Sequence, residues 1–235
     1  MSQTMNVGPP ITCERVRLFR LKLPLRHSFQ TSSHRKSGIE HILVELTDAD
    51  GVTGWGEIAS PSDPFYCAET TDTAWLIATK YLIPAVLGST AETAPELERA
   101  WSKIRGHEFA KAGFSSAAWD LFAKRDGVSL AAALGGTRAT VMAGVSLGIE
   151  PSIDALLAEV DEQVAAGYPR VKLKIAPGWD VAAVRAVRAA HPDLDLHADA
   201  NGAYLPGDGS TGPSPEPARL GPTPSEQPAG ARDAA

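Results

Sequence analysis

Hydrophobic and polar residues alternate along the first part of the chain in the manner of β-strands. The segment CERVRLFRLKL (13–23) alternates, and apolar runs at 39–46 and 52–58 flank the turn DADG (48–51). An Asp-Gly pair between apolar runs is a strong signal for a β-hairpin. The pattern therefore predicts a small antiparallel sheet near the N-terminus.

The pattern then changes to the spacing of amphipathic helices. Residues 70–88 have helical spacing, and we expect Pro84 to end or kink that helix. A second helix is predicted from Thr93, because a threonine cap is followed by a proline and, three residues on, by a glutamate. A third is predicted over 112–127, where Asp126-Gly127 is the stop signal. A sheet followed by helices is an α+β pattern.

The second half of the chain alternates strands and helices. Strands are predicted at 141–149 and 170–175, and residues 194–204 are predicted to be a strand and its following loop. Helices are predicted between them at 152–168 and 179–192. The strands begin about 28 and 25 residues apart, and this spacing, with a helix in between, is typical of βαβ units. Such units build parallel sheets and (β/α)₈ barrels.

The last part of the chain, 205–235, has no period of 2 or 3.6 and is rich in proline and glycine. A segment of this composition buries too little apolar surface to offset the entropy of ordering it. We therefore expect a disordered C-terminal tail.

Composition is that of a globular protein. Of 235 residues, 43% are hydrophobic and 21% charged, and the net charge of −6 does not suggest a nucleic-acid partner. No apolar run reaches the roughly 20 residues of a membrane helix, and the N-terminus has no secretory signal pattern. Two cysteines, Cys13 and Cys67, do not form a disulfide framework, so we expect reduced thiols in a cytoplasmic protein.

The strand RVKLKI (170–175) carries the first candidate chemistry. Val171, Leu173 and Ile175 fall on one face, and Lys172 and Lys174 on the other. Strands of parallel sheets are normally apolar on both faces. In a barrel the two lysines would point inward, where unpaired ammonium groups cost several kcal/mol each. A solvated strand face is the alternative.

The next strand, LDLHADAN, provides a partner. Asp199 and Asn201 fall at its C-terminal end, where barrel enzymes place their chemistry. A carboxylate there suits Mg²⁺, and a metal with an amine base could remove a proton next to a carboxylate. The alternative for Asp199 is a helix cap or turn residue. The histidines of HSFQTSSHRKSGIEH fit a mobile polar loop better than a ligand set, and His197 is interpreted as structural.

Several segments together resemble the enolase superfamily, and within it the o-succinylbenzoate synthase and N-acylamino acid racemase group. They are RVKLKIAPGWD, ADANGAY, PLRHSFQTSS, GWGEIASPSDPFYCAE, YLIPAVLG, IRGHEFAKAG and GVSLGI, which together span about residues 13–204. The resemblance implies an α+β capping domain at 11–135. The first three βα units of an incomplete (β/α)₈ barrel follow at 136–204, with the tail at 205–235.

The resemblance also implies roles for individual residues. Lys174 would be the acid/base and Lys172 its electrostatic partner, and Asp199 would bind Mg²⁺, with Mn²⁺ as an alternative. Four further positions would lie near the substrate: Ser146, Asn201, Phe29 and Tyr66. For the two aromatic residues, ordinary packing is the alternative. The substrate would be a small carboxylate, and the resemblance allows a homo-oligomer. The implied reaction is the dehydration that forms o-succinylbenzoate in menaquinone synthesis, with N-acylamino acid racemisation as the alternative.

The chain also departs from the family pattern. Two further carboxylate ligands and a second lysine are expected on later strands, and the tail resembles a shifted reading frame or a degraded end. Glu226, in SEQP, resembles the second ligand but lacks the apolar strand that would orient it. As a hypothesis from a different functional class, we therefore consider that this chain is a non-catalytic fragment. We expect no measurable turnover, poor Mg²⁺ binding, and aggregation or chaperone binding through an unpaired strand edge.

Overall fold

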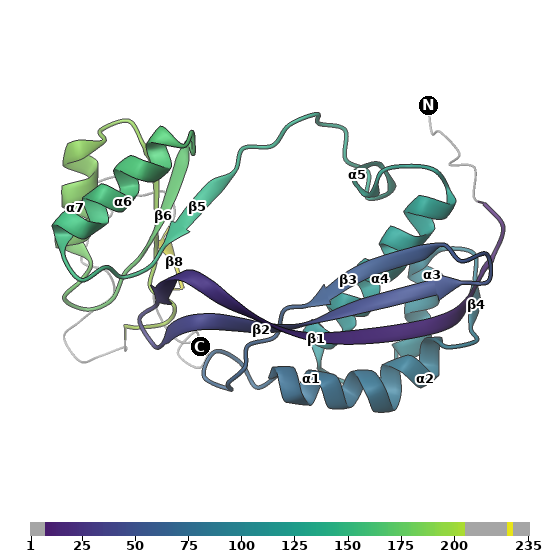
Figure 1. Cartoon of the computed structure of the whole chain (residues 1–235). Coiled ribbons are helices and arrows are strands. Elements are labelled where there is room, and N and C mark those ends of the chain that lie inside the picture. Colours follow the sequence, from purple (N-terminus) through teal and green to yellow (C-terminus); the bar gives the residue numbers. More distant parts are fainter. Residues whose placement is uncertain (1–7, 205–224, 228–235) are drawn as a thin grey trace. The chain divides into compact units, whose positions relative to one another are not determined.

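The structure, a computed structural model, describes residues 8–204 and 225–227 (Figure 1). Within these residues the chain forms two compact units. The first comprises 8–24 and 38–139, and the second comprises 25–37, 140–204 and 225–227. Residues 25–37 therefore group with the second unit, which the sequence pattern did not indicate.

A four-stranded sheet with the order β3-β2-β1-β4 forms one layer of the fold. Its strands are β1 (Ile11–Gln30), β2 (Arg35–Asp48), β3 (Thr53–Ile58) and β4 (Thr90–Ala91). The predicted hairpin is confirmed, because β2 and β3 pair antiparallel from Ile42↔Ile58 to Thr47↔Thr53. Asp48 stabilises its turn by accepting from the backbone N–H groups of Asp50 and Val52 at 3.0 and 2.8 Å.

The first helical run contains a widened turn before its proline. It consists of α1 (Thr71–Ile77), the π-helical η1 (Ala78–Leu82) and α2 (Ile83–Val86). Pro84 does not end the helix, which continues to Val86. A proline ring crowds the carbonyl four residues earlier, and the π turn in front of it relieves that contact. The helix is therefore altered next to Pro84, and the alteration is a π turn.

Three helices follow in this unit: α3 (Ala94–Glu98), extended by the 3₁₀ turn η2 (Arg99–Trp101), then α4 (Glu108–Arg125) and α5 (Leu130–Ala133). Thr93 caps α3 as predicted, since its side chain accepts from the Glu96 N–H. Glu69, which is distant from α4 in the sequence, caps the N-terminus of this helix. Its carboxylate accepts from the N–H groups of Phe109 and Ala110 at 2.9 and 2.8 Å.

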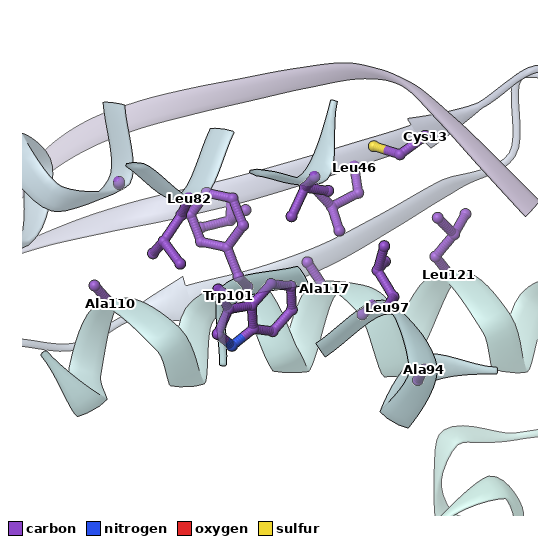
Figure 2. Close-up of a cluster of buried hydrophobic side chains, with 14 of the residues drawn as sticks. Cys13, Leu46, Leu82, Ala94, Leu97, Trp101, Ala110, Ala117 and Leu121 are labelled. Atoms are coloured by element: carbon purple, nitrogen blue, oxygen red, sulfur yellow. The ribbon is translucent and has the colours of Figure 1, made fainter. Parts of the chain in front are cut away.

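The core of the first unit lies between the sheet and these helices (Figure 2). The apolar stripe of α4 faces the sheet, and Phe114, Ala117 and Leu121 are fully buried. Helix and sheet approach closely because glycines line the contact. A Cβ atom added to Gly56 of β3 would lie 2.0 Å from the Gly113 carbonyl oxygen of α4.

The second unit is a parallel sheet with helices in the connections, as the βαβ pattern predicted. Its elements are β5 (Gly144–Leu147), α6 (Ile153–Ala165), β6 (Arg170–Lys174), α7 (Val181–Ala190), β7 (Asp195–Asp199) and β8 (Ser225–Glu226). The strand order is β5-β6-β7-β8, and each neighbouring pair is parallel. The apolar faces of β6, α6 and α7 form a second core, in which Leu156, Leu173 and Val184 are buried.

β8 differs from the expectation of a tail without structure. Most of the predicted disordered tail, 205–224 and 228–235, lies outside the described residues. Ser225 and Glu226, however, pair with Ala198 and Asp199 of β7. The edge of β7 offers unpaired backbone groups, so two residues of any composition can extend the sheet there. Among the described residues, none of the helices is both long enough and apolar enough to span a membrane.

Candidate active site

The two faces of β6 have opposite characters, as predicted. Val171, Leu173 and Ile175 are at most 1% exposed and belong to the second core with α6 and α7. Lys172 and Lys174 lie on the other face of the strand. The Lys174 residue is only 8% exposed. The alternative of a solvated strand face is therefore wrong for Lys174, and a buried ammonium requires a partner.

Asp199 is the partner of both lysines. It is paired in register with Lys174 on the adjacent strand β7 and is 2% exposed. Its Oδ2 lies 2.6 Å from the Lys174 Nζ and 3.2 Å from the Lys172 Nζ. One buried carboxylate thus lies against two ammonium groups at the carboxyl ends of β6 and β7, where βα folds place their chemistry.

Glu226 completes a cluster of four charged side chains, which we call the ion-pair cluster: Lys172, Lys174, Asp199 and Glu226. In β8 it is in register with Asp199, and its Oε2 lies 2.9 Å from the Lys172 Nζ. Glu226 is therefore oriented by a strand, the two-residue β8, although this strand is not the apolar one that was expected to be missing. Its half-exposed side chain shares Lys172 with Asp199, so two carboxylates converge on one amine.

Ion pairing outweighs burial in the electrostatics of the cluster. Burial acts to raise the pKa of Asp199, but hydrogen bonds from Lys174 and from the Asn201 N–H hold this pKa below its ordinary value. Burial acts to lower the pKa of Lys172, but hydrogen bonds to Glu226 and Asp199 raise it above its ordinary value. In this arrangement the charged forms of Asp199 and Lys172 are favoured.

The connection after β7 carries Asn201. Its N–H donates to the Asp199 Oδ1 at 2.9 Å, and its positive φ of 49° makes a sharp turn directly after the strand. Its Nδ2 donates to the Gln227 Oε1 at 3.3 Å. Its side-chain oxygen is buried and has no hydrogen-bond partner among the described residues. An amide oxygen in this state is available to a ligand.

Residues 25–37 contact the same connection. Ser32 Oγ donates to the Ala200 carbonyl at 2.8 Å, and the Ile149 N–H donates to the Gln30 carbonyl at 2.8 Å. Phe29 is half-buried, and a Cβ atom on Gly148 would meet its ring at 3.6 Å. Phe29 therefore lies beside the residues that follow β5.

The remaining predicted positions are less closely tied to the cluster. Ser146 of β5 is exposed and in register with Lys172. Tyr66 belongs to the first unit, where it is 58% exposed, and its role stays a prediction. His197 contacts Asp195, with Nε2 3.2 Å from Oδ1.

The expectation of a mobile polar loop for the three histidines is wrong for His27, which lies in β1, and for His41, which lies in β2. His34 lies between the two strands, and its Nδ1 contacts Thr31 and Ser33.

Some contributors were not found from the sequence. Gln227 and Ser32 contact the connection after β7 across long stretches of chain, and neither lies in a periodic segment. For Glu226, the short motif SEQP was the available signal.

Family models match both halves of the chain. The model of the mandelate racemase / muconate lactonizing enzyme N-terminal domain matches residues 14–135. The enolase C-terminal domain-like model matches residues 155–234, a range that includes Glu226. This chain belongs to the mandelate racemase / muconate lactonizing enzyme family. The predicted enolase-superfamily fold, a capping domain followed by part of a barrel, is thereby confirmed.

Individual relatives agree with this assignment. The chain is 45% identical over 194 residues to an o-succinylbenzoate synthase from Geobacillus kaustophilus, covering 83% of this chain and 52% of the relative. It is 40% identical over 208 residues to an N-succinylamino acid racemase from an Amycolatopsis species, covering 88% and 55%. A crystal structure of an enolase-superfamily member from Listeria innocua superimposes with a TM-score of 0.77 at 38% identity, covering 83% and 53%. The chain spans about half the length of these relatives.

The donor set of the cluster fits Mg²⁺. This ion prefers hard oxygen donors and is commonly held by one or two carboxylates together with water and substrate oxygens. Asp199 and Glu226 are two such carboxylates at the ends of adjacent strands. Asn201, whose backbone N–H donates to Asp199, has a buried side-chain oxygen without a hydrogen-bond partner among the described residues. Among the described residues there is no group of three or more His, Cys, Asp or Glu side chains that could hold a metal.

Proposed function

We propose that the ion-pair cluster is the Mg²⁺-binding and proton-transfer site of an o-succinylbenzoate synthase. The observation that carries this proposal is the convergence of Lys172, Lys174 and two carboxylates at the ends of three adjacent parallel strands. The relative of this name from Geobacillus kaustophilus is 45% identical. In the proposed reaction, 2-succinyl-6-hydroxy-2,4-cyclohexadiene-1-carboxylate loses the proton next to its carboxylate and its hydroxyl group, which leaves as water. The ring becomes aromatic.

Each member of the cluster has a task in this proposal. Asp199 and Glu226 would hold the cation. A bound divalent ion would stabilise the negative charge that develops on the substrate carboxylate as the carbon loses its proton. Lys174 carries the moving proton on its Nζ, because its amine is the more deeply buried and lies at the strand end. Lys172 supplies a fixed positive charge between the two carboxylates.

Turnover tests the proposal directly. The purified chain is incubated with the cyclohexadiene carboxylate and Mg²⁺, and the aromatic product is measured by chromatography. Product formation that is lost in Lys174→Ala but kept in Lys103→Ala, an exposed lysine of the first unit, supports the synthase. Absence of product, together with poor Mg²⁺ binding, favours the non-catalytic alternative. Product formation that persists in Lys174→Ala would contradict the role of this lysine.

N-acylamino acid racemisation is the second candidate, favoured by the 40% identity over 208 residues to the Amycolatopsis racemase. Both reactions begin with removal of a proton next to a carboxylate, so the cluster serves either. The same preparation is offered N-succinylamino acids in deuterium oxide. Incorporation of deuterium at the α-carbon, without formation of the aromatic product from the other substrate, would favour the racemase.

A further inference from the structure

A hydrogen bond outside the ion-pair cluster joins the connections that follow β6 and β7. The Tyr204 hydroxyl donates to the Asp180 Oδ2 at 2.8 Å. Asp180 is also the N-cap of α7, where its Oδ1 accepts from the Val181 N–H at 2.7 Å. One carboxylate therefore holds both the start of α7 and the end of the connection at 200–204.

This connection is linked in turn to the strand that carries Glu226. The Gly202 N–H donates to the Gln227 carbonyl at 2.7 Å, and the Ala200 N–H donates to the Glu226 carbonyl at 3.0 Å. Between these contacts lies Asn201, whose N–H donates to Asp199. Tyr204 thus anchors the far end of a segment whose other contacts run to two members of the ion-pair cluster.

The surroundings of Tyr204 favour a persistent bond. Its side chain belongs to the second core, with Tyr204 only 4% exposed, and Trp179 packs against the same core. Burial, together with the hydrogen bond to Asp180, raises the pKa of the Tyr204 hydroxyl well above its ordinary value, so the group stays a donor. Hydrogen bonds with an ionised acceptor are stronger than neutral ones.

We propose that Tyr204 and Asp180 are positioning residues for the cation site. Their bond fixes the connection 200–204 against α7, and through Gly202 and Gln227 it holds Glu226 beside Asp199. The part of this inference that concerns the cation rests on the proposed function. The part that concerns the order of the connection does not.

The test compares Tyr204→Phe with the unaltered chain in two measurements. This substitution keeps the ring and removes only the hydroxyl. Amide hydrogen exchange, followed by NMR, should be about tenfold faster at Asn201, Gly202 and Ala203. Mg²⁺ affinity, measured by isothermal titration calorimetry, should be about tenfold weaker. Tyr168→Phe is the matched control, because Tyr168 is exposed and precedes β6 at its opposite end; it should change neither measurement.

Two further variants separate positioning from general loss of stability. In an Asp180→Ala background, Tyr204→Phe should produce no additional change in Mg²⁺ affinity, because the two residues act as one unit. Val187→Ala removes a buried contact of α7 and leaves the side chains of Tyr204 and Asp180 unaltered. It should lower the thermal midpoint yet leave Mg²⁺ affinity unchanged at a temperature well below that midpoint.

Unchanged exchange at these three amides in Tyr204→Phe would overturn the inference. Faster exchange with unaltered Mg²⁺ affinity would overturn its claim about the cation ligands. If the unaltered chain showed no Mg²⁺ binding, the proposed function would fail, and the exchange measurement would still decide whether Tyr204 orders the connection.

Discussion

Lys172 and Glu226 form an ion pair across the ends of the parallel sheet, with Nζ 2.9 Å from Oε2. The two residues are 54 positions apart in the sequence, and β7 lies between their strands. The pair brings a second carboxylate to the side of Asp199. Two carboxylates, those of Asp199 and Glu226, therefore share the ammonium group of Lys172.

Replacing Glu226 should weaken Mg²⁺ binding with little effect on folding. Glu226→Gln keeps the shape of the side chain and removes its charge, and we expect Mg²⁺ affinity to fall about tenfold. The free energy of unfolding should change by less than about 1 kcal/mol, because the side chain is half-exposed and its ion pair is screened by water. Calorimetry and urea unfolding measure the two effects. Glu162→Gln, on the exposed face of α6, is the control; an equal loss of affinity in both variants would contradict the role of Glu226.

The two lysines should differ in their contribution to stability. Lys174→Met leaves the buried carboxylate of Asp199 without its closest cation, and we expect the free energy of unfolding to decrease by about 1–3 kcal/mol. Lys172→Met should cost less, because Lys172 contacts Asp199 at a longer distance and is more exposed. Urea unfolding of both variants gives the comparison. A larger loss for Lys172→Met would show that Glu226, rather than Asp199, dominates the electrostatics.

Acid should destabilise the first unit through Glu45. The Arg17 guanidinium donates to both oxygens of this buried carboxylate at 2.8 and 2.6 Å and holds the pKa of Glu45 below its ordinary value. A carboxyl group with a lowered pKa in the folded state contributes stability above its unfolded pKa and loses it as the pH falls toward the folded pKa. Stability should therefore decline below about pH 4.3, the ordinary glutamate pKa.

Glu45→Gln should reduce this acid sensitivity. The variant should be less stable at pH 7 by about 1–2 kcal/mol, and the difference from the unaltered chain should shrink as the pH falls. Urea unfolding at a series of pH values measures the trend. A constant difference across the series would mean that Glu45 does not contribute through its charge.

Close packing of β3 on α4 predicts a severe effect at Gly56. Gly56→Ala would place a methyl group 2.0 Å from the Gly113 carbonyl oxygen, so helix and sheet would have to separate. We expect a loss of about 3 kcal/mol or more in the free energy of unfolding. Gly51→Asn is the control, since nothing lies within 4 Å of a Cβ there and asparagine tolerates the positive φ. Similar losses for the two variants would contradict the close contact.

The sequence predicted those parts of the fold that repeat regularly. Alternation placed Val171, Leu173 and Ile175 in the core and the two lysines opposite them, because period-2 patterning leaves a strand few other ways to bury its apolar side. Asp199 was predicted as a candidate site residue because it lies at the end of the next strand. The fold class and the family also followed, because the motifs occur in both halves of the chain.

The features that the sequence missed depend on pairing between distant residues. β8 contains two residues, too few to show a period, and its pairing comes from the free edge of β7. β4 and α5 are likewise too short for their residues to show a period. The Tyr204–Asp180 bond joins two connections, and nothing in the local pattern of either predicts the other.

A Mg²⁺ titration of the chain and of Asp199→Asn, followed by calorimetry, measures whether the ion-pair cluster binds the ion. We expect weak binding by the unaltered chain, with Kd roughly millimolar, because two carboxylates already paired with lysines provide the site. Binding by the variant should be at least about tenfold weaker. Equal affinity in the two proteins would show that the ion does not bind at the ion-pair cluster.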